Sequence, residues 1–341
     1  MRAVLPALIL SVVTSIVAGC LSVGSIEELT GPAQGSTYHI KYVRHSSAPS
    51  PEQLKVAVQD VLDTVDRQVS TYRPDSDIQH FNALASNQCM PIKDEMASML
   101  NYAFILGQQS GGAYDITLLP LLRAWGFAPS SNTQELPNLV DIAKAKHNTG
   151  WAHLSLRNNQ LCKANAAVEI DLNSLAAGFT VDRIARRFDE LGISSYFIEV
   201  TGETFAKGYK PNGSAWQVAL EQPNLEGKQI IAKILPLNNL AVATSGDYRN
   251  YKTLQGRRYS HIIDPRSASP ITHNTATVVS NATMQADAQA TLLLILGQEE
   301  GLKFAEQHAI AALFIVRDQQ EFVIQTTRAF DAMFAQGELH E

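Results

Sequence analysis

The chain has 341 residues, enough for one large domain or two with a substantial hydrophobic core. Hydrophobic residues make up 45% and charged residues 18%, as in ordinary globular proteins, and the sequence contains no repeats, low-complexity tract or heptad run. The net charge of −6 gives no electrostatic reason to expect binding to nucleic acid, so we expect no nucleic-acid partner.

Residues 1–19 have the pattern of a bacterial lipoprotein signal peptide. Arg2 supplies a short positive region, and the apolar stretch 3–18 is too short for a good membrane-spanning helix. The stretch ends in Val-Ala-Gly-Cys, which resembles a lipobox, so we expect Cys20 to be lipidated; a simple signal peptide or a buried cysteine is the alternative. We expect a lipid anchor on the periplasmic face of a bacterial membrane, and Leu21 after the cysteine favours the outer membrane.

The pattern divides the chain into four segments. We expect a signal peptide at 1–19, a lipidated tether at 20–31, one folded domain at 32–336 and a loose tail at 337–341. Cys89 and Cys162 are far apart in sequence and lack metal-ligand spacing. An oxidising periplasm would allow them to pair, but the sequence cannot show whether they approach, and we expect two unpaired, buried thiols.

Strand and helix patterns follow one another along the folded part. Ser50 is a typical N-cap before Pro51, and the apolar residues that follow share one face of a helix up to residue 69. Gly192 is a typical stop for a helix that begins near residue 174. The same reasoning predicts strands at 37–43, 196–200, 216–221, 240–243, 259–263, 275–279, 311–316 and 322–326, hairpin turns at 158–159 and 254–257, and helices at 95–107, 286–297 and 301–307.

Two places in this pattern are suited to binding a ligand. The ends of the strands at 240–243 and 259–263 carry hydroxyls, carboxylates, His261 and Arg266, although an ordinary hairpin with polar tips uses the same residue types. At 169–178 a strand runs into the start of a helix, where free amide groups and the helix dipole favour an anion such as phosphate.

Several motifs, in order, resemble those of the ApbE family, the FAD:protein FMN transferases. They are Ser-Thr-Tyr-Arg-Pro-Asp-Ser-Asp-Ile at 70–78, Gly-Gly-Ala-Tyr-Asp-Ile-Thr at 111–117, Asp-Leu-Asn-Ser-Leu-Ala-Ala-Gly at 171–178, Thr-Ser-Gly-Asp-Tyr at 244–248, Tyr-Ser-His-Ile-Ile-Asp-Pro-Arg at 259–266 and Ala-Asp-Ala-Gln-Ala-Thr at 286–291. The resemblance runs from about residue 35 to 297. It implies an α+β fold, ApbE-like (T-fold-like), in which β-sheets are flanked by helices and two subdomains enclose one FAD.

The resemblance also implies an activity. Family members use Mg²⁺ to transfer FMN from FAD to a threonine hydroxyl of a partner protein, and AMP is released. The usual acceptors are flavoprotein subunits of membrane redox complexes, with the threonine in an Asp-Gly-x-x-Ser/Ala-Thr type motif. Two alternatives stay open: an FAD pyrophosphatase that yields FMN and AMP, and a non-catalytic FAD-binding lipoprotein.

The resemblance assigns the metal site to residues of two predicted helices. Asp287 and Thr291 are four residues apart, so they share one helix face, and with an oxygen from Ser174 they form a set of hard ligands suited to Mg²⁺. Without the resemblance, Asp287 would be interpreted as a helix cap. Asp287 and His261 are the candidate catalytic residues, although no definite role follows for His261. The residues implied in FAD binding are Gln34, Tyr72, Ala113, Tyr114, Asp115, Asp171, Ala177 and His261.

Four positions depart from the family pattern. Gln34 stands where a methionine is usual, and Ala177 stands where lysine or glutamate is usual, so a polar contact with FAD is missing there. Thr201 and Ala268 stand where the family has glycine, so we expect the local backbone to differ at these two positions.

Overall fold

The computed structural model describes residues 24–129, 131, 135–222, 230–246, 251–272, 275–318 and 321–335. The expected signal peptide, Cys20, Leu21 and the expected tail at 337–341 lie outside these residues, as do Asp247 and Tyr248 of one family motif.

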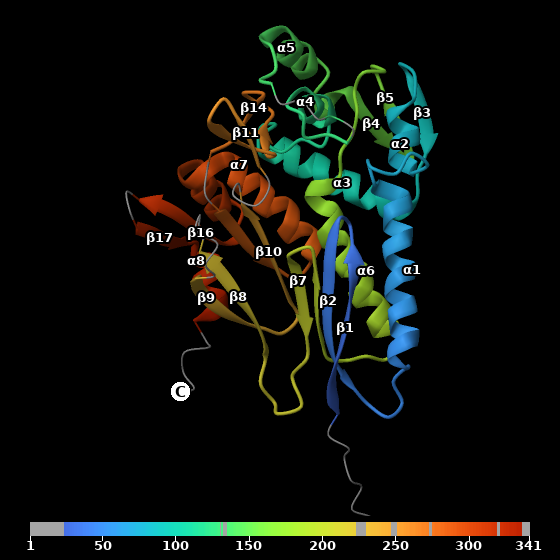
Figure 1. The fold of residues 1–341 in the computed structure, drawn as a ribbon, viewed down its shortest axis with the longest axis vertical. Coiled ribbons are helices and arrows are strands. Elements are labelled where there is room, and N and C mark those ends of the chain that lie inside the picture. The colour runs from blue at the N-terminus through green and yellow to red at the C-terminus, as the bar shows by residue number, and fades with distance from the viewer. Residues whose placement is uncertain are drawn as a thin grey trace, which may run out of the picture.

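An eight-stranded antiparallel sheet forms the centre of the molecule (Figure 1). Its order is β1-β2-β6-β7-β10-β15-β16-β17, and every neighbouring pair is antiparallel. Its strands are β1 (Ser25–Ala33), β2 (Ser36–Arg44), β6 (Tyr196–Val200), β7 (Glu203–Lys207), β10 (Leu240–Gly246), β15 (Thr275–Ser280), β16 (Ala311–Asp318) and β17 (Glu321–Thr326).

Each face of the sheet packs into its own apolar core, because successive side chains of a strand point to opposite faces. Ala312 and Phe314 of β16 join the core formed with three long helices, α1 (Pro51–Val69), α6 (Asn173–Glu190) and α7 (Thr283–Gln307). Leu313 and Ile315 join the opposite core, which is covered by β8 (Trp216–Gln222), β9 (Ile230–Leu237) and α8 (Arg328–Phe334). A sheet covered on both faces holds its edges in fixed positions.

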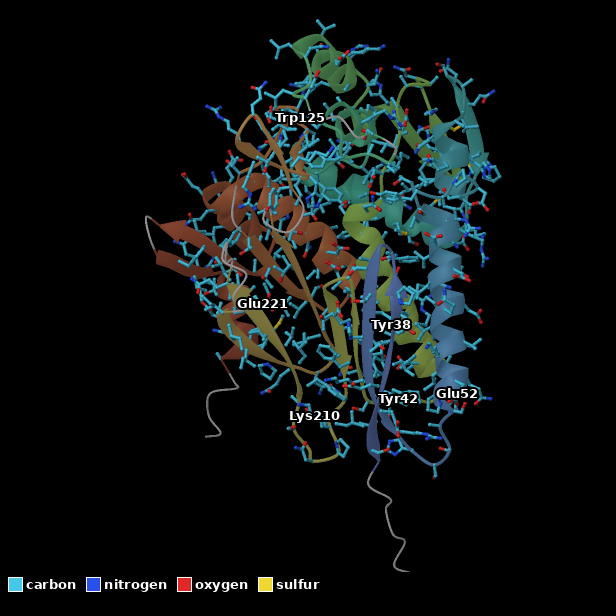
Figure 2. The ribbon with its side chains drawn as sticks, viewed as in Figure 1. Tyr38, Tyr42, Glu52, Trp125, Lys210 and Glu221 are labelled. Atoms are coloured by element: carbon cyan, nitrogen blue, oxygen red, sulfur yellow. A yellow bond between two sulfur atoms is a disulfide. The ribbon has the colours of Figure 1, made fainter. Side chains whose placement is uncertain are left out.

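Helix α1 begins and packs as its sequence predicts. The Ser50 hydroxyl accepts a hydrogen bond from the Gln53 amide, and the Gln53 side chain accepts one from the Ser50 amide, so the N-terminus carries a complete capping box. Its apolar face packs near Tyr38 and Tyr42 of β2, whose rings are buried between the sheet and the helices (Figure 2). Gly192, with φ 77°, follows the end of α6, also as expected.

Short elements cover one end of the sheet, at the top of Figure 1. They are α2 (Asp77–Asn82), β3 (Gln88–Pro91), α3 (Asp94–Gln109), α4 (Leu119–Ala124), α5 (Leu139–His147), the 3-10 turn Trp151–His153, β4 (Leu154–Arg157), β5 (Gln160–Lys163), β11 (Tyr251–Leu254), β12 (Arg257–Ser260), β13 (Ile263–Asp264) and β14 (Ser269–Pro270). The hairpins at 158–159 and 254–257 are confirmed, since β4 pairs with β5 and β11 pairs with β12.

The expected tether is wrong from Ser25 onward. Residues 25–33 form β1, an edge strand whose nine residues pair in register with β2, from Ser25 opposite Arg44 to Ala33 opposite Ser36. Leu29 and Ala33 are buried beneath it. Only Leu29 and Ala33 of its nine residues are buried, because only one face of this edge strand contributes to the core, so the sequence showed no clear apolar alternation.

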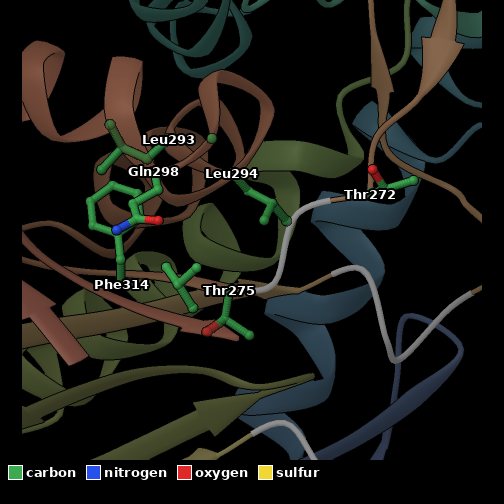
Figure 3. Close-up of a pocket in the computed structure, with 8 residues that line it drawn as sticks. Thr272, Thr275, Leu293, Leu294, Gln298 and Phe314 are labelled. Atoms are coloured by element: carbon green, nitrogen blue, oxygen red, sulfur yellow. The ribbon is translucent and has the colours of Figure 1, made fainter. Parts of the chain in front are cut away.

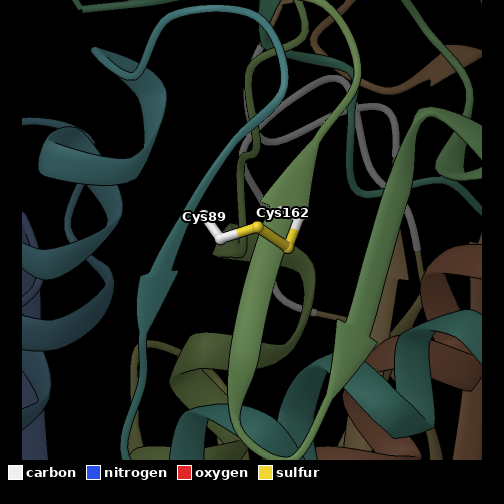
Figure 4. Close-up of a disulfide and its surroundings, with 2 residues drawn as sticks. All are labelled: Cys89 and Cys162. Atoms are coloured by element: carbon white, nitrogen blue, oxygen red, sulfur yellow. A yellow bond between two sulfur atoms is a disulfide. The ribbon is translucent and has the colours of Figure 1, made fainter.

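The expected free thiols are also wrong. Cys89 of β3 and Cys162 of β5 lie directly opposite each other and form a disulfide (Figure 4). The two cysteines have a sequence separation of 73, and the sequence gave no sign of this pairing, which follows from the way β3, β5 and β4 associate in a small sheet.

Smaller differences concern element ends. Strand β10 continues through Thr244 and Ser245 to Gly246, because both residues pair with β15. The expected strand at 259–263 is divided between β12 and β13, and α8 was not predicted. The two expected helices at 286–297 and 301–307 run together as α7, but Gly297 breaks the helical geometry between them with φ 74° and ψ −177°.

Candidate active site

The start of α6 presents a buried carboxylate. Asp171 is 8% exposed, and its backbone amide donates to the carbonyl of Ile116 (2.8 Å). Its carboxylate accepts hydrogen bonds from the backbone amide and the side-chain amide of Asn173, at 2.8 and 3.1 Å. Burial raises its pKa to about 6, because few groups replace the lost water. The site therefore offers a strong, partly desolvated acceptor beside a helix N-terminus.

Tyr72 supplies an exposed ring near this carboxylate. The residue is 68% exposed, yet burial of its hydroxyl and, secondarily, the charge of Asp171 raise its pKa. Two hydrogen bonds hold the loop that precedes Tyr72. The Ser76 hydroxyl donates to the carbonyl of Ser70 (2.7 Å), and the Gln79 side chain donates to the carbonyl of Thr71 (2.8 Å). A flat aromatic surface held in place suits stacking against a planar ligand.

The segment Ala113–Asp115 lies deeper. Ala113 and Tyr114 are buried, and the Tyr114 hydroxyl hydrogen-bonds the Ser174 hydroxyl at 2.8 Å. Asp115 accepts hydrogen bonds from the amide and hydroxyl of Thr117 (2.7 and 2.6 Å) and from the amide of Trp151 (3.0 Å). Those three contacts engage its carboxylate in holding the loop, while Tyr114 connects the loop to α6.

Asp287 joins α7 to α6. Its carboxylate, 6% exposed, accepts a hydrogen bond from the backbone amide of Gly178 at 3.0 Å. Burial raises its pKa well above the usual range, and the nearby carboxylates of Glu203 and Asp182 raise it further. The pKa of Tyr114 is also raised, first by burial and then by Asp287 and Asp171, so this phenol lies near both acids.

The two helices touch closely at this point. A Cβ added to Gly178 would lie 2.5 Å from the carbonyl oxygen of Thr283, so only glycine permits this approach. Asp182 of α6 accepts hydrogen bonds from the amides of Thr283 and Met284, at 2.7 and 3.0 Å. It thereby caps α7, whose own N-cap residue Ala282 has no side-chain acceptor.

The expected metal ligands lie around this junction. Thr291 is one turn beyond Asp287, and its hydroxyl hydrogen-bonds the Ser245 hydroxyl of β10 at 3.1 Å. Ser174 is one turn before Gly178, the donor to Asp287. Across the described ranges, no group of three or more His, Cys, Asp or Glu residues is arranged to hold a metal. The expected set has one carboxylate and two hydroxyl residues, all oxygen donors, and a hard divalent cation would offset the charge repulsion at Asp287. The residues present therefore fit Mg²⁺.

The remaining expected site residues lie along the same end of the sheet. Gln34 occupies the β1–β2 turn with φ 46°, and its side-chain amide donates to the hydroxyl of Thr180 on α6 (2.8 Å). Ala177 of α6 and His261, between β12 and β13, are half-buried. Thr201 and Ala268, where glycine is usual in the family, adopt φ values of 55° and 57°, in the left-handed region that favours glycine.

Sequence reasoning missed four residues that build this site: Asn82, Lys163, Gly178 in its packing role, and Asp182. The strand alternation of β5 buries both Leu161 and Lys163, and that period-two pattern was the available signal for a buried lysine. The contacts of Asp182 and Gly178 join α6 to α7 across about 100 residues of sequence, a distance at which periodicity carries no information.

A separate cavity lies elsewhere. It has a volume of about 120 Å³ and is lined by residues around the Gly297 break of α7, including Thr275, Gln298 and Phe314 (Figure 3). Gly297 is ten residues from Asp287, which corresponds to roughly 15 Å along a helix. The cavity is smaller than ordinary ligand pockets of about 300–1,000 Å³, and none of the expected site residues lines it.

Comparison with known proteins identifies the family of the chain. Residues 34–314 match the model of the ApbE family. The chain is 33% identical to the FAD:protein FMN transferase of Vibrio cholerae serotype O1, over 92% of this chain and 95% of that protein. It is 34% identical to the protein of the same name from Haemophilus influenzae, over 92% and 93%.

Solved structures confirm the α+β fold. The flavinyl transferase ApbE of Pseudomonas stutzeri, in its apo form, superposes with a TM-score of 0.84 at 45% identity, covering 91% of this chain and 97% of that chain. The flavin transferase ApbE of Vibrio cholerae gives a TM-score of 0.85 at 32% identity, covering 91% and 99%. On the family match, the relatives and the fold together, the chain belongs to the ApbE family.

Proposed function

We propose that this protein is an FAD:protein FMN transferase. The observation that carries the proposal is the meeting of three elements at the first turns of α6: the Asp171 carboxylate, the Tyr114–Ser174 hydrogen bond and the Asp287–Gly178 hydrogen bond. The names of the relatives, flavin transferases over nearly the whole chain, support the same activity.

Each part of the site has a role in this proposal. Asp171, an acceptor with a raised pKa, hydrogen-bonds the nucleotide, and the exposed ring of Tyr72 stacks against a flat part of FAD. The N-terminus of α6 favours the negatively charged pyrophosphate. Gln34, Ala177 and His261 border the same end of the sheet, and we propose flavin contacts for them on the family resemblance.

We propose Ser174, Asp287 and Thr291 as the residues that would hold Mg²⁺. When bound, the ion would neutralise charge that develops on the pyrophosphate oxygens. Asp182 and Gly178 keep Asp287 in position, because they fix the start of α7 against α6. The carboxylate is thus directed by backbone contacts rather than by a flexible loop.

The proposed reaction exchanges one bond to the flavin-side phosphorus. The oxygen of an acceptor threonine forms a bond to this phosphorus, and the phosphorus–oxygen bond to the AMP portion breaks. AMP leaves with the bridging oxygen, and the hydroxyl proton is released. We propose as acceptor a flavoprotein subunit of a membrane redox complex, with its threonine in an Asp-Gly-x-x-Ser/Ala-Thr type motif.

One incubation separates this function from its two alternatives. The protein is mixed with FAD, Mg²⁺ and a peptide carrying the acceptor motif, and the products are analysed on a denaturing gel and by chromatography. Fluorescent peptide together with AMP indicates a transferase. Free FMN and AMP indicate a pyrophosphatase, and unchanged FAD that co-purifies with the protein indicates a non-catalytic binder. A peptide in which alanine replaces the threonine is the control.

We also propose a lipid anchor at Cys20 on the periplasmic side of a membrane. No helix in the described ranges has the length and apolar character to cross a bilayer. Ser25, where β1 begins, is five positions after Cys20, so the strand starts within roughly 18 Å of the anchor. An anchor there would hold the sheet close to the lipid surface.

A further inference from the structure

Lys163 is a fully buried lysine near the candidate site. It is 1% exposed, and its ammonium group donates three hydrogen bonds, to the carbonyl oxygens of Asn82 (2.8 Å), Ala166 (2.9 Å) and Val168 (3.1 Å). A protonated lysine has three N–H donors and no acceptor, so these contacts use all of them. Burial lowers its pKa, and the carbonyl oxygens compensate the lost water.

These three carbonyls belong to two segments that approach only through the fold. Asn82 ends α2, so the ammonium lies at the C-terminus of that helix, where a cation is favoured by the helix dipole. Ala166 and Val168 belong to the segment that leads to Asp171. Lys163 therefore joins α2 to the segment that presents the flavin-binding carboxylate.

The side chain of Asn82 completes the connection. Its amide nitrogen donates to the carbonyl of Ile170 (2.9 Å), and its oxygen accepts from the amide of Ile170 (2.8 Å). Both backbone groups of the residue before Asp171 are thus held by one side chain. The Asp171 amide is held in turn by the carbonyl of Ile116.

The same network reaches the aromatic loop. Asn82 also donates to the side-chain oxygen of Gln79 at 3.4 Å, and Gln79 donates to the carbonyl of Thr71, the residue before Tyr72. Helix α2 is therefore held at one end by Lys163. Its side chains Gln79 and Asn82 bind the Tyr72 loop and the Asp171 segment, respectively.

We propose that Lys163 is a positioning residue for flavin binding, which sets Tyr72 and Asp171 at the separation that one flavin nucleotide requires. The inference rests on the proposed function, because the flavin is the ligand it concerns. Lys163 does not touch the ligand; it acts through α2 and the backbone of 166–170. If Lys163 only stabilised the domain, its replacement would leave the separation of Tyr72 and Asp171 unchanged in the folded protein.

The test is a double-mutant cycle on FAD affinity. The mature chain with Lys163→Met, Asp171→Ala or both is titrated with FAD by fluorescence, at a temperature where circular dichroism shows each variant folded. We expect Lys163→Met to weaken binding at least tenfold. We expect Asp171→Ala to cost much less in the Lys163→Met background than in the wild type, because a displaced carboxylate has already lost its contact.

Two further variants make the test specific. Lys207→Met removes a lysine that pairs with Asp189 at 2.9 Å on another part of the fold; we expect unchanged FAD affinity and a full effect of Asp171→Ala. Lys163→Arg keeps a cationic donor, and we expect it to restore part of the affinity. If Lys163→Met does not fold, Asn82→Ala replaces it, since it removes both bonds to Ile170.

The outcomes separate this inference from the proposed function. A wild-type protein that does not bind FAD overturns the proposed function and this inference with it. A wild type that binds FAD, with a Lys163→Met variant that binds within twofold or with additive effects in the cycle, overturns the positioning role alone.

Discussion

Asp171, which we propose binds the nucleotide, reduces the stability of the free protein. Its pKa is about 6 in the folded chain against an ordinary value of 3.8, so the unfolded chain gives up the proton at lower pH and folding becomes less favourable as pH rises through this range. A pKa difference of this size corresponds to roughly 3 kcal/mol at most. The ionised Asp171 therefore lowers the free energy of unfolding of the free protein, and binding of a ligand can offset this loss.

We predict that Asp171→Asn stabilises the protein without FAD at pH 8 and weakens FAD binding. Asparagine keeps an acceptor for the Asn173 amide but cannot ionise, so the gain approaches roughly 3 kcal/mol at pH 8 and shrinks as pH falls toward 4. Thermal melts of both proteins at pH 5 and pH 8 measure it. An equal difference at the two pH values would show that ionisation of Asp171 is not the cause.

The expected metal ligands make a second residue-scale prediction. We expect Asp287→Ala to lower turnover by orders of magnitude while much of the FAD affinity remains, because Tyr72 and Asp171 lie on other elements. We expect Thr291→Ala to be milder, since water can replace a neutral hydroxyl. Chelator treatment of the wild type should reproduce the Asp287→Ala result, and added Mg²⁺ should reverse it. If the Asp287→Ala variant cleaves FAD at the wild-type rate at saturating Mg²⁺, Asp287 is excluded from the mechanism.

At the scale of elements, the contact of α6 with α7 determines the geometry of the site. Gly178 permits the approach, its amide holds Asp287, and Asp182 caps α7 one turn later on α6. The two helices pack against each other, and α7 also packs on β10 and β15 of the sheet. A shift of either helix therefore moves the carboxylate and its partner relative to each other.

We predict that Gly178→Ala lowers both stability and FAD cleavage. The new Cβ would meet the Thr283 backbone at 2.5 Å, and separating the helices costs roughly 1–3 kcal/mol and displaces the amide from Asp287. Gly301→Ala is the control: it lies on α7 beyond the break, and its nearest neighbours include the Phe314 ring at 3.0 Å. We expect it to change the melting temperature but not the cleavage rate. Normal cleavage by Gly178→Ala would refute the role of this contact.

At the scale of the molecule, the disulfide closes a long loop. It joins β3 to β5 at a sequence separation of 73, and the loop includes α3, α4 and α5. Constraining such a loop in the unfolded chain typically contributes about 2–4 kcal/mol. The residue after Cys162 is Lys163, so the bond also lies next to the network that leads to Asp171.

We predict that a reductant lowers the melting temperature of the wild type to that of the variant with Cys89→Ser and Cys162→Ser, and leaves the double variant unchanged. Calorimetry with and without dithiothreitol measures both. A wild type whose melting temperature does not respond to reduction, with the thiols shown to be free by a labelling reagent, would mean that the bond adds no stability.

The proposed lipid anchor at Cys20 gives the last prediction. We expect Cys20→Ser to release the protein from the membrane fraction of a producing bacterium, because the lipid would no longer be attached. Fractionation with detection of the protein measures this, and the FAD affinity of the released protein should match that of the wild type. Wild-type protein recovered in the soluble periplasmic fraction would contradict the anchor.

The sequence by itself determined the elements whose signals are local. The capping residues around Pro51, the stop at Gly192 and the two hairpin turns rest on neighbouring residues, so they are predictable from pattern alone. The ordered motifs also indicated the family and its fold, because several of them occur in the right sequence. The same local reasoning placed Asp287 and Thr291 on one face of a helix. It also predicted that a strand ends at Asp171 and runs into a helix; the helix is α6, but residues 169–171 form no strand in the structure.

Only the tertiary structure decided how distant segments meet. The Cys89–Cys162 bond, the pairing of β1 with β2 and the Asp287–Gly178 contact each depend on which surfaces pack together. Lys163 illustrates the reason most clearly: its buried ammonium group is compensated by three carbonyl oxygens, and those oxygens come from segments 3 to 81 residues away. Periodicity predicts which side of a helix or strand faces the core. The fold decides which residues from other segments that side contacts.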